Sequence, residues 1–203
     1  MLEYFLDIQA QGRPFQRHNH PLNQLFGVQN GLPTFMATQH PVASVKEGDN
    51  YVARLRKFPA KFHQVLEGVR QREQEGIVPP TFVVEKVLAE MQAFVATPAR
   101  ENILYTSLAE KIGKAPDGAI GAEEGRRLLD ATEAAITTQV YPVYAEMIAY
   151  YEELRPKTTG NHGAWALPDG DAFYAWAVRQ QTTTGMTPDQ VHELGLSEVA
   201  RIE

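Results

Sequence analysis

The sequence predicts an all-α protein, a multi-helix array of bundle-like or orthogonal packing. Apolar residues recur at spacings of three and four through most of the chain, which is the pattern of helices with one buried face. Helix-start signals precede several of these runs. At 203 residues the chain is long enough to bury a sizeable core. We expect one helical lobe over residues 1–203.

Residues 1–43 do not show this periodicity. They are rich in Gln, Asn, Gly, Pro and His, as in "QRHNHPLNQLFGVQNGLPTFMATQHP". Such a composition favours turns over long helices. We expect an irregular segment with short helical turns that wraps over other elements.

The helical core is predicted over residues 44–155. Ser44 and Glu47 have the spacing of a capping box, which would start the first helix. Pro59 interrupts the apolar face that follows, because proline lacks an N–H donor and clashes with the preceding turn. We therefore expect a kink, or a break and restart, at that point.

Two further features lie within this core. Thr97 and Pro98 are typical of a helix N-cap followed by a first-turn proline, so they predict a helix start. The longest helical pattern runs over 122–154 and contains Pro142, which predicts a kink near Gln139–Tyr141.

Residues 156–203 are predicted to form a loop followed by helices. A loop or short hairpin is expected near 158–171, with Asp169 and Gly170 at its turn. Thr187 to Gln190 then supply a capping signal for the last helix. Its apolar positions continue to Ile202 without a stop signal. We therefore expect the chain to be truncated at its C-terminus.

Composition excludes several classes of function. The chain has no cysteine, so it has neither disulfides nor thiolate zinc sites. Its net charge is −6, and no basic stripe alternates with aromatic residues, which argues against a nucleic-acid partner. The basic cluster Arg54, Arg56, Lys57 and Lys61 is interpreted as a solvated helix face. No apolar run approaches a membrane span and no signal peptide is evident, which leaves the compartment open.

The candidate metal motifs are incomplete. His192 and Glu193 look like the start of the zinc-protease pattern H-E-x-x-H, but Leu196 stands where the second histidine is needed. His63 and Glu67 stand four residues apart and could share a metal, although a simple helix-face pair is the preferred interpretation.

Two polar loops are weaker candidates for ligand sites. The polar stretch His18-Asn19-His20 would make at most a two-ligand clip. Asp169 and Asp171 lack the spacing of a calcium loop and are better explained as turn residues. The aromatic residues of the last third could line a ligand groove, but packing in the core is the commoner role. They are Trp165, Phe173, Tyr174 and Trp176.

The order of segments resembles the N-terminal part of a bacterial family, domain of unknown function 885. The most specific segment is "GAWALPDGDAFYAWAVRQQTTTGMTPDQVHELGLSEVARI", in which one departure from the family pattern is Phe173-Tyr174, where two tyrosines are expected. "NQLFGVQNGLPTFMATQHPV" and "VYPVYAEMIAYYEELRP" also match. The resemblance covers nearly the whole chain but about the first third of a typical member.

This resemblance implies a zinc metallopeptidase of the H-E-x-x-H type, similar to helical oligopeptidases and carboxypeptidases. The zinc ligands of the family lie downstream, so it assigns no catalytic, cofactor-binding or metal residue to this chain. The chain would form one wall of a substrate channel and be inactive alone, with a peptide or small molecule as substrate and zinc in the full-length protein. The candidate channel-lining residues are Trp165, Tyr174, His192 and Arg201.

The alternative is a freestanding helical binding or scaffold module whose partner covers the last helix. Under either hypothesis, the apolar face of that helix is expected to bind the rest of the protein, a partner or a second copy of the chain.

Overall fold

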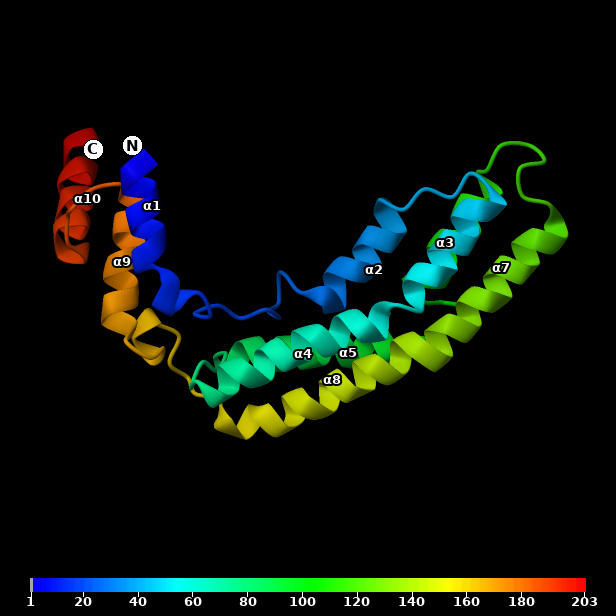
Figure 1. Ribbon diagram of the computed structural model, residues 1–203, viewed down its shortest axis with the longest axis horizontal. Coiled ribbons are helices and arrows are strands. Elements are labelled where there is room, and N and C mark those ends of the chain that lie inside the picture. The colour runs from blue at the N-terminus through cyan, green and yellow to red at the C-terminus, as the bar shows by residue number, and fades with distance from the viewer. Residues whose placement is uncertain (1) are drawn as a thin grey trace. The chain divides into compact units, whose positions relative to one another are not determined.

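The computed structural model describes residues 2–203, which form α-helices and short helical turns joined by loops (Figure 1). No strand occurs in these residues, so the all-α prediction is confirmed. We expected one lobe, whereas the described chain divides into two compact units. The larger unit comprises residues 20–71 and 79–160, and the smaller unit comprises 2–19, 72–78 and 161–203. Each unit combines segments distant in sequence, which a linear pattern does not reveal.

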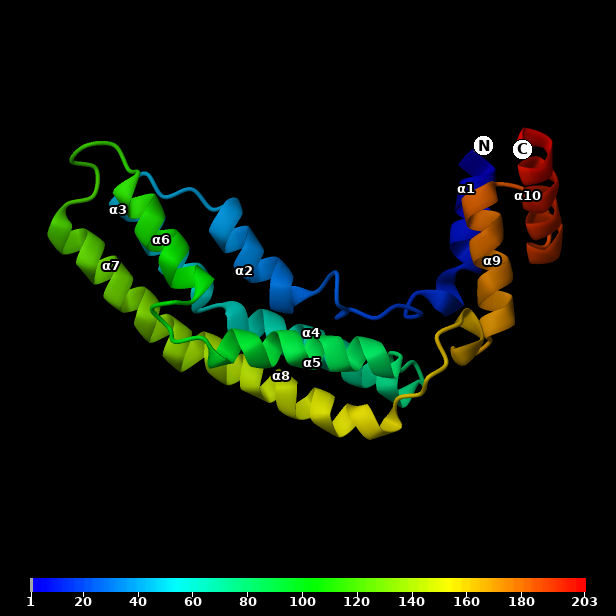
Figure 2. The ribbon, with the colours of Figure 1, turned by 180° about the vertical axis from the view of Figure 1, so that it is seen from behind.

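A long helical rod organises the larger unit. Helices α7 and α8 are joined through a π-helical turn and continue in one direction (Figure 1). Helices α3 and α6 pack against α7, α2 packs against α6, and α5 packs against α8 (Figure 2). The bounds are α2 Val28–Thr38, α3 Val45–Leu55, α4 Phe58–Gln74, α5 Thr81–Ala96, α6 Ile103–Gly113, α7 Ala122–Ala135, the π-helical turn Ile136–Val140, α8 Tyr141–Leu154 and the 3₁₀ turn Arg155–Lys157. The last three residues of α4, 72–74, are counted with the smaller unit.

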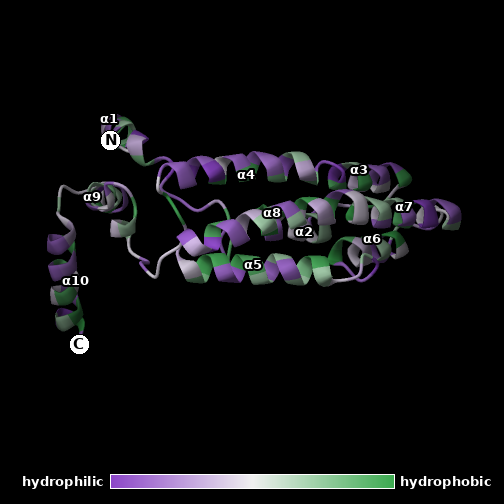
Figure 3. Cartoon of the chain, turned by 90° about the horizontal axis from the view of Figure 1, so that it is seen from below, coloured by the Kyte–Doolittle hydropathy of each residue, from purple (hydrophilic) through white to green (hydrophobic). Residues whose placement is uncertain are grey.

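Packed aromatic rings, of which Phe62 and Tyr144 are fully buried, hold α4, α5 and α8 together. The ring of Tyr144 on α8 lies 4.8 Å from that of Phe62 on α4 and 4.4 Å from that of Phe94 on α5. In the view from below in Figure 3, α8 lies between α4 and α5, and α4 is coloured mostly as hydrophilic. The Tyr144 hydroxyl donates a hydrogen bond to the carbonyl of Gln29, which ties α8 to α2. One buried side chain therefore connects four helices.

The helix starts at Ser44 and Pro59 agree with the prediction in position. Ser44 Oγ accepts a hydrogen bond from the Glu47 amide, but the backbone amide that donates to the Glu47 carboxylate is that of Ala43, 2.6 Å away, rather than that of Ser44. At Pro59 the chain breaks and restarts, because α3 ends at Leu55 and α4 begins one residue before the proline. First-turn proline is tolerated because its missing donor has no partner there.

The predicted helix start at Thr97-Pro98 is wrong. Thr97 instead follows the end of α5, and α6 starts after Asn102, whose side-chain oxygen accepts a hydrogen bond from Leu104 N. Thr97 and Asn102 are both residue types that commonly cap the N-terminus of a helix. Asn102 prevails because it is buried and its amide nitrogen also reaches Phe94 O and the Tyr141 hydroxyl.

The prediction of an irregular segment at 1–43 is also corrected, since two helices form there. They are α1 Leu2–Gln11 in the smaller unit and α2 in the larger unit. The Lys111 ammonium of α6 donates hydrogen bonds to Met36 O at 2.6 Å and His40 O at 2.7 Å, at the C-terminal end of α2. A cation suits this end of a helix, where carbonyls lack intrahelical partners. A residue 75 positions away thus stabilises α2.

The smaller unit is built on the contact of α1 with α9. Trp176 Nε1 donates a hydrogen bond to Ile8 O, and the Tyr4 hydroxyl donates to Arg179 O. The predicted loop near 158–171 is present without a hairpin, and Asp169 has a left-handed backbone, φ 48°. The elements are α1, the 3₁₀ turn Arg13–Phe15, the 3₁₀ turn Ala164–Ala166, α9 Gly170–Thr182 and α10 Pro188–Ile202.

Helix α10 begins with the predicted capping box, formed by Thr187 and Gln190 in both directions. It buries none of its residues. Within residues 2–203, no helix has the length and apolar character needed to cross a membrane.

Candidate functional site

A hollow of about 440 Å³ lies where the 3₁₀ turn Ala164–Ala166 meets the start of α9. All of the residues that line it come from one short stretch of the smaller unit. They are Trp165, Leu167, Asp169, Gly170, Asp171 and Ala172. We refer to it as the Trp165 hollow.

Close backbone packing shapes the Trp165 hollow. A Cβ on Gly170 would lie 2.3 Å from the carbonyl oxygen of Ala164 and 2.7 Å from the Cα of Trp165, so only glycine fits there. The preceding Asp169 adopts the left-handed conformation, which Asp tolerates better than most residues. The loop is thereby held against the first turn of α9, and Trp165 is held at its rim.

The chemistry of the Trp165 hollow combines an aromatic face with two acids. Trp165 is 73% exposed, which is unusual for so large an apolar side chain. In the part of the chain that is described, Asp169 and Asp171 form no ion pair. An indole ring beside carboxylates suits a positively charged group such as an ammonium or a guanidinium. From the sequence, these two acids are expected to be turn residues only.

The four candidate channel-lining residues are not brought together in one site. Tyr174 on α9 is 53% exposed but does not line the Trp165 hollow. His192 and Arg201 lie on α10, where Arg201 pairs with Glu198 at 2.6 Å. Their role as channel-lining residues stays a prediction.

The other aromatic residues of α9 pack inside the smaller unit. Rings of Phe173 and Trp176 lie 6.1 Å apart, and both contact Phe15. The ring of His18 lies 5.1 Å from that of Phe173, and its Nε2 is 2.8 Å from Pro168 O. Phe173 and Trp176 thus pack against other rings but stay partly exposed, so neither belongs to the buried core that was expected for such aromatics.

The histidines do not fit a zinc ion. His63 Nε2 lies 2.8 Å from a carboxylate oxygen of Glu146 on α8, so its partner is not Glu67. Both side chains of this pair are more than half exposed. Across residues 2–203, no three side chains of the types His, Cys, Asp and Glu gather closely enough to hold a metal. A zinc site needs at least three such ligands, and we derive no metal chemistry from this chain.

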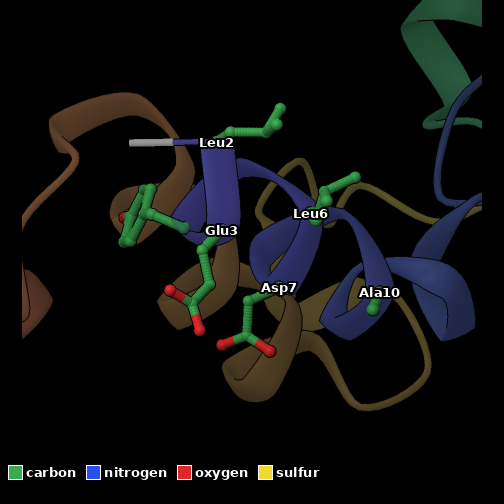
Figure 4. Close-up of a pocket in the computed structure, with 6 residues that line it drawn as sticks. Leu2, Glu3, Leu6, Asp7 and Ala10 are labelled. Atoms are coloured by element: carbon green, nitrogen blue, oxygen red, sulfur yellow. The ribbon is translucent and has the colours of Figure 1, made fainter.

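A broad open depression runs along one face of α1, with a volume of about 870 Å³. Figure 4 shows the carboxylates of Glu3 and Asp7 projecting on one side and Leu2 and Leu6 on another. Its lining comes entirely from this one helix. A ligand pocket normally encloses most of its ligand, so this face is not assigned as a site.

Comparison with known proteins identifies the family. The chain matches the model of the family described as bacterial protein of unknown function (DUF885) over residues 1–203, and it belongs to that family. A crystal structure of a "putative lipoprotein" from Colwellia psychrerythraea is similar to it, with 26% sequence identity and a TM-score of 0.82. The match covers 89% of this chain and 31% of the Colwellia chain, so this chain spans about a third of that protein. No curated protein matches.

Proposed function

We propose that this chain is the N-terminal helical region of a zinc-dependent peptidase and contributes one wall of its substrate channel. The observation that carries the proposal is the match to the Colwellia protein, in which the corresponding helices make up 31% of a longer chain. The reaction class is the one that the resemblance described above implies, that of H-E-x-x-H peptidases. In such enzymes zinc polarises the scissile carbonyl and activates water, and its ligands would lie outside these residues.

The Trp165 hollow is the part of this chain that we assign to substrate binding. Its indole and two carboxylates match a charged amine next to an apolar side chain, as at the N-terminus of a peptide or at a lysine. Such a contact would hold the substrate equally in the ground state and the transition state. It would therefore affect KM and leave kcat unchanged.

The test uses the full-length gene product. We expect stoichiometric zinc by metal analysis and hydrolysis of short peptides that chelation abolishes, with neither property in residues 1–203 alone. Full-length protein that is folded but free of both zinc and peptidase activity would overturn the proposal.

Variants of the full-length protein then test the assignment of the hollow. Trp165→Ala and Asp171→Asn are expected to raise KM about three- to tenfold for peptides with an N-terminal lysine, at unchanged kcat. Asp189→Asn on α10 removes the same type of charge away from the hollow and serves as the control. Equal KM in all variants would show that the hollow does not bind substrate.

The second candidate function is a non-catalytic binding or scaffold module, and α10 favours it. This helix buries no residue and exposes Leu194, Leu196, Val199 and Ile202. A module of this kind would bind its partner through α10 without zinc. The metal analysis and peptide assay above therefore separate the two functions.

A further inference from the structure

A second hollow lies in the larger unit, between α2 and the junction of α3 with α4. Its volume is about 170 Å³, and its exposed surface is almost entirely carbon. The residues that line it are Leu32, Phe35, Met36, Arg54, Lys57, Phe58 and Lys61. We refer to it as the basic hollow.

The floor of the basic hollow is apolar and well ordered by packing. Met36 and Phe58 are buried at 1% and 3% exposure, whereas Phe35 at the rim is 41% exposed. The Arg54 guanidinium lies over the Phe35 ring, 5.5 Å from its centroid. For comparison, an apolar cavity of about 150 Å³ that was engineered into another protein binds benzene. The basic hollow thus has room for about one phenyl or branched alkyl group.

Three cations surround this floor without carboxylate partners. No ion pair links Arg54, Lys57 or Lys61 to an acid in the described part of the chain. Residues 50–66 contain no Asp or Glu, and α2 has no charged residue at all. In a chain of net charge −6 this is a concentrated positive surface, which attracts acidic groups.

We propose that the basic hollow docks an acidic segment of a separate polypeptide, which inserts one large apolar side chain between flanking carboxylates. The apolar floor takes the anchor residue, and the three cations pair with the carboxylates beside it. A small apolar anchor with a charged rim is a common way to combine affinity with partner selection. A nucleic acid offers phosphates but no side chain that would fill the floor.

The test titrates fluorescein-labelled ten-residue peptides into the 203-residue chain and follows anisotropy. The first peptide has a central Leu-Phe pair flanked by glutamates; the second replaces the pair by Ala-Ala, and the third replaces the glutamates by lysines. We expect binding of the first peptide, at least about tenfold weaker binding of the second, and no detectable binding of the third. Raised salt should weaken the first complex.

Matched variants locate the site. Lys57→Glu with Lys61→Glu should weaken the first peptide about tenfold or more, because attraction becomes repulsion. The pair Lys46→Glu and Lys86→Glu changes the net charge equally but leaves the basic hollow intact, so binding should persist. Circular dichroism confirms that each variant is folded. Equal effects of both pairs would overturn the proposal.

Ligands of the basic hollow other than an acidic peptide would give different results in these binding experiments. If single-stranded DNA or anionic lipid vesicles bind as tightly as the first peptide, the surface recognises negative charge alone and the proposal fails. If the 203-residue chain binds the first peptide but the full-length protein does not, the hollow is covered by the protein itself and a separate partner is excluded. Binding by both forms supports the proposal, whatever the outcome of the peptidase assay.

Discussion

Asn102 uses both ends of its side-chain amide at the centre of the larger unit. Its oxygen caps α6 at Leu104 N, 3.0 Å away, and its nitrogen reaches Phe94 O and the Tyr141 hydroxyl at 3.4 and 3.3 Å. Because the residue is 2% exposed, water cannot replace these partners. A buried polar group of this kind stabilises only while its partners are present.

We predict that Asn102→Ala lowers the free energy of unfolding by about 1–3 kcal/mol, from the lost cap and the unpaired groups left behind. Asn102→Ser keeps a capping oxygen and should lose less. Urea denaturation followed by circular dichroism measures both. An Ala variant within about 0.5 kcal/mol of the unmodified protein would contradict this account.

Buried tyrosines make stability depend on alkaline pH. Burial raises the pKa of Tyr51 to about 12, partly offset by its hydrogen bond with Ser107. Burial also raises the pKa of Tyr144 and of Tyr151. In the unfolded chain these groups titrate near 10. The folded state therefore retains protons that the unfolded state has lost above that pH.

We predict full stability from these groups below pH about 10 and a progressive loss as the pH rises from about 10 through about 12. Urea midpoints across this range, with tyrosinate absorbance as a second signal, measure the loss. Tyr51→Phe should be less stable at neutral pH, because its hydrogen bond to Leu104 O is absent, yet lose less on going to alkaline pH. A pH dependence unchanged by that substitution would exclude Tyr51 as a contributor.

At the scale of elements, the turn before Pro142 shows how a helix accommodates a mismatch. A kink was predicted near Gln139–Tyr141; the irregularity is a π-helical turn at Ile136–Val140, closed by a hydrogen bond from Tyr141 N to Ile136 O. A π turn carries one extra residue relative to an α-helix. The extra residue shifts the helical register, so that the buried face of α7 meets α3 and α6 and the buried face of α8 meets α5.

We predict that deleting Thr138, which is exposed, converts the π turn to regular helix with a modest loss of stability. Deleting the exposed Ala145 within α8 should cost much more, because it rotates Met147 through Leu154 by about 100° away from their packing partners. Thermal denaturation compares the two deletions. Equal losses would mean that the π turn is not the site of the extra residue.

At the scale of the whole molecule, two surfaces remain available for contact. Helix α10 exposes apolar residues along its length, and the basic hollow exposes cations around an apolar floor. A row of exposed apolar residues such as that on α10 is a mark of an interface. The two differ in charge, so they would select different partners.

We predict that the 203-residue chain self-associates at high concentration through α10. The double variant Leu194→Glu/Val199→Glu should reduce the association constant about tenfold or more, because it places charge where apolar surface is buried. Ser197→Glu on the same helix is the control and should associate as before. Sedimentation velocity over a concentration series measures this, and a strictly monomeric chain would contradict it.

Much of the helical pattern could be read from the sequence because its signals are local. The Thr187 capping box, the restart at Pro59 and the length of the 122–154 run depend on neighbours within one or two turns. The wrong predictions involve contacts between residues far apart in the sequence. Thr97 and Asn102 are both suited to cap a helix, and Asn102 caps α6 because it is buried among its other partners.

For the site, the sequence places Trp165 among the candidate residues but indicates only a role in a turn for Asp169 and Asp171. The Trp165 hollow forms because Gly170 allows a 3₁₀ turn to touch the start of α9, a contact that spacing does not predict. The cations of the basic hollow were interpreted as a solvated face for a similar reason. Nothing local shows that uncharged α2 lies beside them.

The sequence by itself determined the all-α class, the absence of thiol chemistry and the family resemblance, because these follow from composition, periodicity and motif order. Only the tertiary structure decided which segments share a unit, where α2 ends and which charges lack partners. Lys111 caps a helix 75 residues away, and α2 completes a hollow begun by α3 and α4. Such contacts join residues whose separation along the chain carries no periodic signal, so only folding brings them together.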